Sequence, residues 1–172
     1  MEIKDKKIII IGLETTYTDV GSGEAVLIMH GWAASSAYWK DISIMLAEKG
    51  FRAVALDLPG FGGTSAPNSV WSLNDYADFV DSFTGEIGLN RFHLLGHSFG
   101  GALAMKMSVR EPGKISKLIL CDAAAIRGER LNLRQKISKF LANIGSKLVS
   151  STSPFYKIAE KLAYRFAGSY DY

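Results

Sequence analysis

The chain has 172 residues, of which 48% are hydrophobic and 22% charged, a balance typical of one globular domain with a buried core. No apolar run approaches the roughly 20 residues needed to cross a bilayer, so we expect no stable insertion into a membrane. Cys121 is the only cysteine, which excludes an internal disulfide and a cysteine metal cluster and favours a reducing cytoplasm.

The net charge of +3 is unevenly distributed. Residues 127–172 carry nine Lys or Arg against three acidic residues, whereas the first 126 residues are net acidic. A basic segment can favour a membrane surface or an anionic substrate, but a solvated helix face explains such charges more often, and we expect no nucleic-acid partner. The change in charge predicts a boundary near residue 126.

Apolar runs and turn residues alternate along the first two thirds of the chain. In chain order they predict strands at 8–11, 13–19 and 25–29, a helix at 37–49, a strand at 51–56, a helix between Ser72 and Gly88, a strand at 92–95, a helix at 101–109 and a strand at 117–121. The apolar face expected for the first helix consists of Tyr38, Ile42, Met45 and Leu46, with Lys49 beside them. Ser72 and Asp75 have the spacing of a capping box at the start of the second helix.

Such alternation predicts an α/β fold with a mostly parallel sheet, helices on both faces and ligands bound where strands end. After Ala125 the pattern changes to amphipathic helices alone. We therefore expect residues 1–126 to form the N-terminal part of the core and residues 127–172 to begin a helical cap or lid.

The motif Gly96-His97-Ser98-Phe99-Gly100 lies between a predicted strand and a predicted helix, the context that a nucleophile elbow requires. In such an elbow the serine has a strained backbone, and the glycines, here with Gly101 following, let strand and helix approach closely. Ser98 is the candidate nucleophile, and bulk at Gly96 or Gly100 should disrupt the turn. The alternative is a glycine-lined turn whose serine only caps a helix.

Acyl transfer also needs donors for the developing oxyanion. One is the backbone N–H of the residue after the nucleophile, here Phe99, and the second must come from another loop. His30-Gly31-Trp32 directly follows a buried strand, which puts the Trp32 N–H at the same sheet edge as Ser98. The alternative for Trp32 is simple packing, and for His30 we prefer a structural, hydrogen-bonded role.

Three segments, His30 to Trp32, Asp57-Leu58-Pro59-Gly60-Phe61-Gly62 and Gly96 to Gly101, resemble the α/β-hydrolase superfamily, over residues 8–125. The resemblance implies that Ser98 attacks, that Trp32 and Phe99 form the oxyanion hole, and that Asp57 is structural. The serine at position 98 argues against the haloalkane dehalogenase and epoxide hydrolase branches of the superfamily, which have an aspartate as the nucleophile of the elbow. Carboxylesterases and carbon–carbon bond hydrolases are most similar, which implies attack on a small apolar acyl substrate through an acyl-enzyme, without cofactor or metal.

The triad of this fold runs serine, acid, histidine along the chain, but no histidine follows His97. His97 adjoins Ser98 in a tight turn and should point away from its hydroxyl, and His93 is expected in the core. Asp122 follows a strand, but we expect it to cap a turn.

The missing acid and histidine predict an N-terminal fragment with little activity by itself. Its last strand should be an unprotected sheet edge. The alternative is a non-catalytic binding protein or pseudoenzyme with the same fold. Nucleotide binding is disfavoured, because the glycine-rich segment lacks both the P-loop ending and the dinucleotide spacing. The sequence predicts no oligomeric state.

Overall fold

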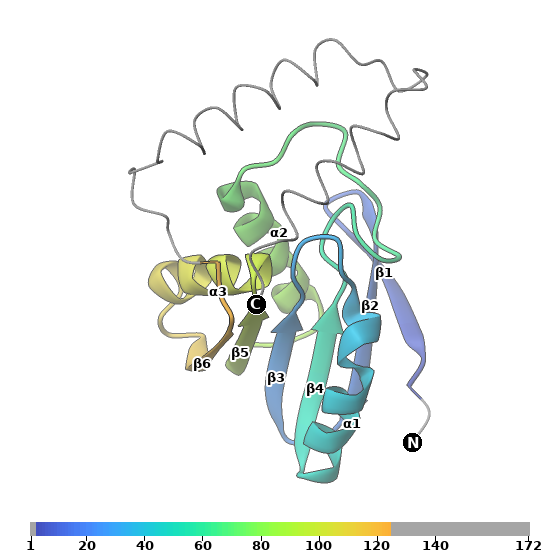
Figure 1. The fold of residues 1–172 in the computed structure, drawn as a ribbon, viewed down its shortest axis with the longest axis vertical. Coiled ribbons are helices and arrows are strands. Elements are labelled where there is room, and N and C mark those ends of the chain that lie inside the picture. The colour runs from blue at the N-terminus through green and yellow to red at the C-terminus, as the bar shows by residue number, and fades with distance from the viewer. Residues whose placement is uncertain (1–2, 125–172) are drawn as a thin grey trace. The chain divides into compact units, whose positions relative to one another are not determined.

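The computed structural model describes residues 3–124. These residues form a six-stranded sheet in the order β1-β2-β4-β3-β5-β6 (Figure 1). The strands are β1 (Asp5–Ile10), β2 (Leu13–Gly21), β3 (Glu24–Met29), β4 (Phe51–Leu56), β5 (Phe92–His97) and β6 (Ile115–Cys121). The β1–β2 and β2–β4 pairs are antiparallel, and β4, β3, β5 and β6 are parallel to one another. The predicted α/β class with a mostly parallel sheet is confirmed.

Helices cover both faces of this sheet (Figure 1). They are the short 3-10 helix η1 (Ser36–Trp39), α1 (Lys40–Glu48), α2 (Leu73–Glu86) and α3 (Phe99–Arg110). Alternate residues of each strand point to opposite faces, so Leu27 and Val54 belong to the larger core with α2 and α3. Their neighbours Val26 and Ala53 form a smaller core against α1.

The capping box at the start of α2 is confirmed. The Ser72 hydroxyl accepts the Asp75 N–H at 3.4 Å, and the Asp75 carboxylate accepts the Ser72 N–H at 2.7 Å. The Ser72 hydroxyl also donates to the Asp75 carboxylate at 2.7 Å, and this bond, together with that from the Ser72 N–H, holds the pKa of the Asp75 carboxyl below its usual value. The buried face of α2 contains Tyr76, Phe79, Val80 and Phe83, as the apolar spacing predicted.

The predicted face of α1 was wrong except for Leu46. Tyr38 is 78% exposed and Met45 59% exposed, whereas Ser43 is fully buried. The helix packs on β4 and β2 through Ser43 and its half-buried neighbours Leu46 and Ala47, about a quarter turn from the expected face.

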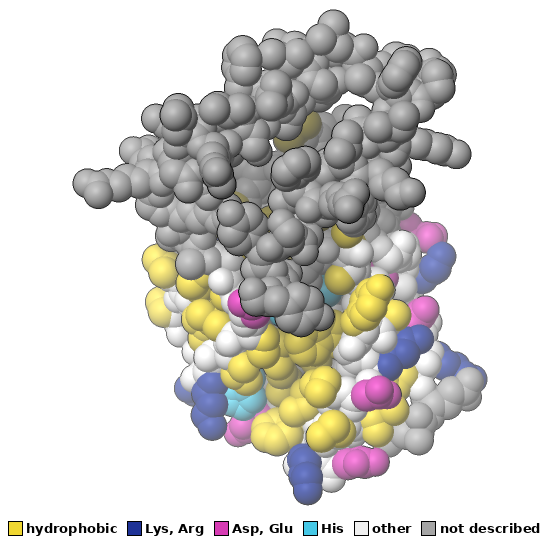
Figure 2. All heavy atoms as spheres, in the orientation of Figure 1, with side chains coloured by type: hydrophobic (Ala, Val, Ile, Leu, Met, Phe, Trp, Pro, Cys, Tyr) yellow, Lys and Arg dark blue, Asp and Glu magenta, His cyan; other side chains and the backbone are white. Residues whose placement is uncertain are grey.

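On the α1 side of the sheet, no helix of the described part lies over β5 and β6. Figure 2 shows hydrophobic side chains gathered on this face. Ile42 of α1 and Ile119 of β6 are 38% and 41% exposed, and β6 is the last strand of the described sheet, as expected.

The elements around Ser98 are longer than predicted. β5 continues to His97, and α3 starts at Phe99 instead of Gly101. The expected second segment, residues 127–172, lies outside the described residues, so its helices and the boundary near residue 126 stay predictions.

Candidate active site

Ser98 forms the whole connection between β5 and α3. Its backbone has φ 49° and ψ −112°, a conformation that costs a non-glycine residue about 1 to 3 kcal/mol. The Ser98 N–H donates to the Cys121 carbonyl at 3.2 Å, and the Ala124 N–H donates to the Ser98 carbonyl at 2.9 Å, so the turn is anchored to the end of β6. Ser98 occupies the N-cap position of α3, but within the described residues its side chain makes no capping hydrogen bond to the helix.

Close backbone approach explains the three glycines of the turn. A Cβ on Gly96 would lie 2.3 Å from the Gly100 carbonyl oxygen, and one on Gly100 would lie 2.3 Å from that of Met29. A Cβ on Gly101 would lie 2.5 Å from Ala123 Cβ. Because two of these contacts are with backbone, a side chain there would force strand and helix apart.

The loop after β3 lies directly against Ser98. A Cβ on Gly31 would be 3.2 Å from Ser98 Cβ and 2.9 Å from His97 Nδ1. The Trp32 and Phe99 rings are in edge contact, with centroids 5.6 Å apart. Within residues 3–124, no backbone hydrogen bond uses the N–H of Trp32 or Phe99. Within this part of the chain, two N–H groups without a backbone acceptor therefore belong to residues near the serine, Trp32 in the loop after β3 and Phe99 directly after Ser98.

His30 ties this loop to the one after β4. Its side chain is fully buried, its Nδ1–H donates to the Gly31 carbonyl at 2.7 Å, and its Nε2 accepts the Leu58 N–H at 3.0 Å. Because a peptide N–H only donates, Nε2 carries no proton, and the ring is the neutral Nδ1–H tautomer. Burial lowers the pKa of His30, which favours the same neutral form.

Within residues 3–124, the carboxylate of Asp57 accepts hydrogen bonds from backbone N–H groups only. Its buried carboxylate accepts the Ser36 N–H at 2.6 Å and the Gly63 N–H at 2.8 Å, and its carbonyl accepts the Thr64 hydroxyl at 2.7 Å. These contacts fix the two loops that flank the β3 and β4 strand ends. They fit the structural role expected for this carboxylate.

An aromatic cluster beside Ser98 was not predicted. The Trp32 ring, 68% exposed, contacts Phe61 at 4.9 Å as well as Phe99, and Phe99 contacts Tyr76 at 5.2 Å. The Tyr76 hydroxyl donates to the Pro59 carbonyl at 3.2 Å, and burial raises its pKa. Phe61 lies within the Asp57 to Gly62 segment, in which the sequence analysis singled out only Asp57.

No described histidine pairs with the Ser98 hydroxyl. The His97 ring lies beside Trp39, with centroids 6.2 Å apart, and within residues 3–124 it forms no hydrogen bond with Ser98. His93 is buried at the other end of β5, and both His30 nitrogens are occupied. Asp122 is exposed, with φ 44°.

The described residues contain neither a cluster of metal ligands nor a membrane-spanning helix. Among residues 3–124, no three His, Cys, Asp or Glu side chains gather as metal ligands would. Over the same range, every helix is too short or too polar to cross a membrane.

The family described as the alpha/beta hydrolase fold matches residues 24–146, most of the chain and all of the turn around Ser98. The chain belongs to the α/β-hydrolase family. Among its curated relatives, the 2-hydroxy-6-oxo-2,4-heptadienoate hydrolase of Pseudomonas putida is 30% identical over 121 residues, which is 69% of this chain and 44% of that protein. The bifunctional epoxide hydrolase 2 of Sus scrofa is 32% identical over 106 residues, or 60% of this chain and 19% of that protein.

Among solved structures, this α/β hydrolase is similar to a membrane phospholipase A described as a bacterial virulence factor. The TM-score is 0.72 at 31% identity, over 80% of this chain and 46% of the other. The chain thus spans less than half the length of each of these three relatives. Their names state different substrates, so the similarity gives the family and the fold and leaves the substrate open.

Proposed function

We propose that this chain carries the nucleophile and the oxyanion-binding loops of a serine hydrolase that cleaves an ester, thioester or related acyl bond. The observation that carries the proposal is the strained backbone of Ser98, whose side chain is unused by the helix that follows. Backbone strain of this kind clusters at active sites.

In the proposed reaction the Ser98 oxygen attacks the acyl carbonyl carbon and loses its proton to a general base. The carbonyl oxygen becomes an oxyanion that accepts hydrogen bonds from the backbone N–H groups of Trp32 and Phe99. The base then gives this proton to the leaving group, whose bond to the acyl carbon breaks, and an acyl-enzyme remains. Water then adds to the acyl carbon and gives a proton to the base, and the base returns it to the Ser98 oxygen as the acid is released.

The described residues do not include a general base for Ser98. Each of the three histidines of the sequence lies in the described part, and none pairs with Ser98. We therefore propose that an acid and a histidine encoded beyond Tyr172 complete the site. The 172 residues alone should show only weak hydrolysis, from the oxyanion hole and substrate binding.

The proposed substrate is small, with an apolar acyl group. Support comes from the rings of Trp32, Phe61 and Phe99 beside the serine, because apolar and aromatic walls are typical of small-molecule sites. A carboxylesterase-like reaction in the cytoplasm, without cofactor or metal, is our working proposal. The relative from Sus scrofa, named an epoxide hydrolase, shows that similarity alone does not select the reaction.

A second candidate is a non-catalytic binding protein with this fold. It is favoured by one observation, that no described histidine reaches the serine hydroxyl. In that case the same sheet edge would bind a ligand without turning it over.

The test is hydrolysis of p-nitrophenyl acetate by the whole gene product, including whatever the gene encodes beyond Tyr172. We expect turnover that falls to background in Ser98→Ala. The matched control is Ser82→Ala, because this exposed serine on α2 bonds only to the Asp78 carbonyl of its own helix. Turnover that is unchanged in Ser98→Ala would overturn the nucleophile assignment, and binding of the ester without turnover would favour the second candidate.

A further inference from the structure

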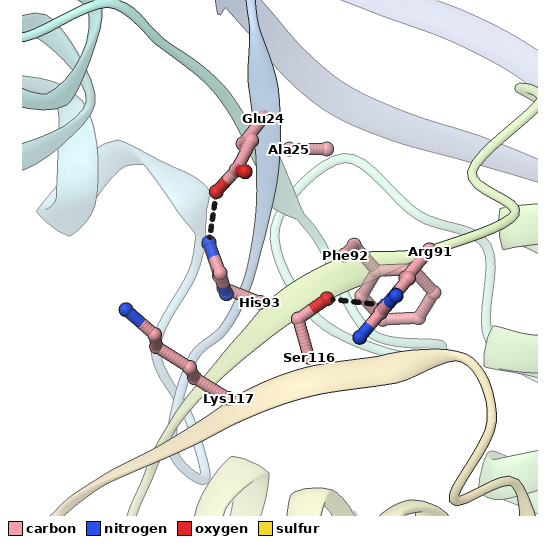
Figure 3. Close-up of a pocket in the computed structure, with 7 residues that line it drawn as sticks. All are labelled: Glu24, Ala25, Arg91, Phe92, His93, Ser116 and Lys117. Atoms are coloured by element: carbon pink, nitrogen blue, oxygen red, sulfur yellow. Dashed lines mark hydrogen bonds and ion pairs between the residues drawn. The ribbon is translucent and has the colours of Figure 1, made fainter.

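A cavity of about 500 Å³ lies where β3, β5 and β6 begin. Its polar lining comes from the starts of these strands and the residue before β5: Glu24, Arg91, His93, Ser116 and Lys117 (Figure 3). Ser98 follows the other end of β5, so the six residues of that strand, about 20 Å at 3.3 Å each, separate the two places. The cavity is therefore distinct from the proposed active site.

Two positive side chains of this cavity have no carboxylate partner. Six other Lys or Arg side chains of the described part form ion pairs: Lys6, Lys7, Lys40, Arg52, Arg110 and Lys114. Within residues 3–124, Arg91 and Lys117 form none, and the Arg91 Nε–H donates only to the Ser116 hydroxyl at 3.0 Å. Two uncompensated cations thus line one concave surface.

The carboxylate of the cavity is already engaged. His93 Nε2 donates to Glu24 Oε2 at 2.9 Å, on the side of the cavity away from Arg91 and Ser116 (Figure 3). The His93 side chain is 9% exposed, and its Nδ1 is buried without a hydrogen-bond partner. A buried polar atom without a partner is uncommon, and a ring nitrogen that carries no hydrogen can accept a hydrogen bond from a water molecule.

We propose that this cavity binds a small ligand through an oxyanion group, either a phosphate or a carboxylate. The two cations Arg91 and Lys117 and the one carboxylate Glu24 sum to one net positive charge. The Arg91 guanidinium keeps its terminal N–H groups, Lys117 offers an ammonium, and the Ser116 hydroxyl accepts from Arg91 and keeps its own proton to donate. Such charge-assisted hydrogen bonds are about twice as strong as neutral ones. The inference does not depend on the role of Ser98.

The test is calorimetric titration of the 172-residue chain with inorganic phosphate and, separately, with acetate, at constant ionic strength held with sodium chloride. We expect saturable binding of at least one anion. The double variant Arg91→Gln/Lys117→Gln should weaken it at least about tenfold, because each charge-assisted hydrogen bond contributes that much. Arg91→Lys keeps the charge but loses the contact with Ser116, so binding should be intermediate.

The matched control is Lys106→Gln, which removes a lysine of α3 that lies outside the cavity and has no ion pair within the described part. We expect this variant to bind like the original chain, and circular dichroism of each variant checks its fold. Preference for phosphate over acetate would identify a phosphate site, and the reverse a carboxylate site. An absence of saturable binding, or equal binding by the double variant and the control, would overturn the inference.

Discussion

Replacing Asp57 with alanine tests how the loops around Ser98 are held. Alanine leaves the Ser36 and Gly63 N–H groups without their acceptor. Each unsatisfied buried donor costs about 1 to 3 kcal/mol, and water can reach the exposed Gly63 more easily than the buried Ser36. We therefore expect the free energy of unfolding to fall by about 2 to 4 kcal/mol. Asp57→Asn keeps one acceptor and turns an NH₂ toward the other donor, so its loss should be about half as large.

The assay is urea unfolding of the 172-residue chain, followed by circular dichroism at several denaturant concentrations. The control is Asp41→Ala on the first turn of α1, where an exposed carboxylate should contribute less than about 1 kcal/mol. If Asp57→Ala loses no more than Asp41→Ala, the carboxylate does not hold the loops, and the structural role assigned to it is wrong.

Three further predictions concern residues next to the elbow. Burial puts the pKa of folded His30 below its ordinary 6.5, so below pH 6.5 the unfolded chain binds more protons than the folded chain. The free energy of unfolding measured in urea titrations should therefore decline as the pH falls through this range, and an equal decline in His30→Gln would contradict this. Gly100→Ala should lower the free energy of unfolding by more than about 2 kcal/mol, because the added methyl group meets backbone, whereas Gly85→Ala, where a Cβ meets open space in α2, should raise it by up to about 1 kcal/mol. Thermal unfolding measures both, and similar midpoints for the two variants would refute the close approach at Gly100. Ser98→Gly should raise the unfolding free energy by about 1 kcal/mol by releasing the positive φ, and a loss would exclude strain as the reason for this geometry.

Local signals made part of the fold predictable. The α2 start follows from Ser72 and Asp75, which meet within one helical turn. The α3 start does not follow in the same way, because Gly100 and Gly101 count against a helix, although contacts with β3 and the residues after β6 require glycine there. The orientation of α1 was missed because hydrophobic spacing alone does not show which face meets the sheet.

In the candidate site, too, features carried by a contiguous motif could be predicted and contacts between distant residues could not. The positions of Ser98 and of the loop ending in Trp32 at strand ends could be predicted because each motif is contiguous and follows a strand. The bond from Leu58 to His30 spans 28 positions and that from Ser36 to Asp57 spans 21, and no sequence pattern specifies which distant N–H a buried side chain will accept. The contact of Trp32 with Phe61 likewise depends on two loops from different strands.

The measurement that tests the serine-hydrolase proposal most directly is the sequence of the coding DNA beyond the Tyr172 codon. We predict that the reading frame continues and supplies an Asp or Glu after one strand-like run and a His after the next, which would complete a triad with Ser98. A stop codon directly after Tyr172 would contradict the proposed hydrolase, and the binding-protein candidate would then be the one to pursue.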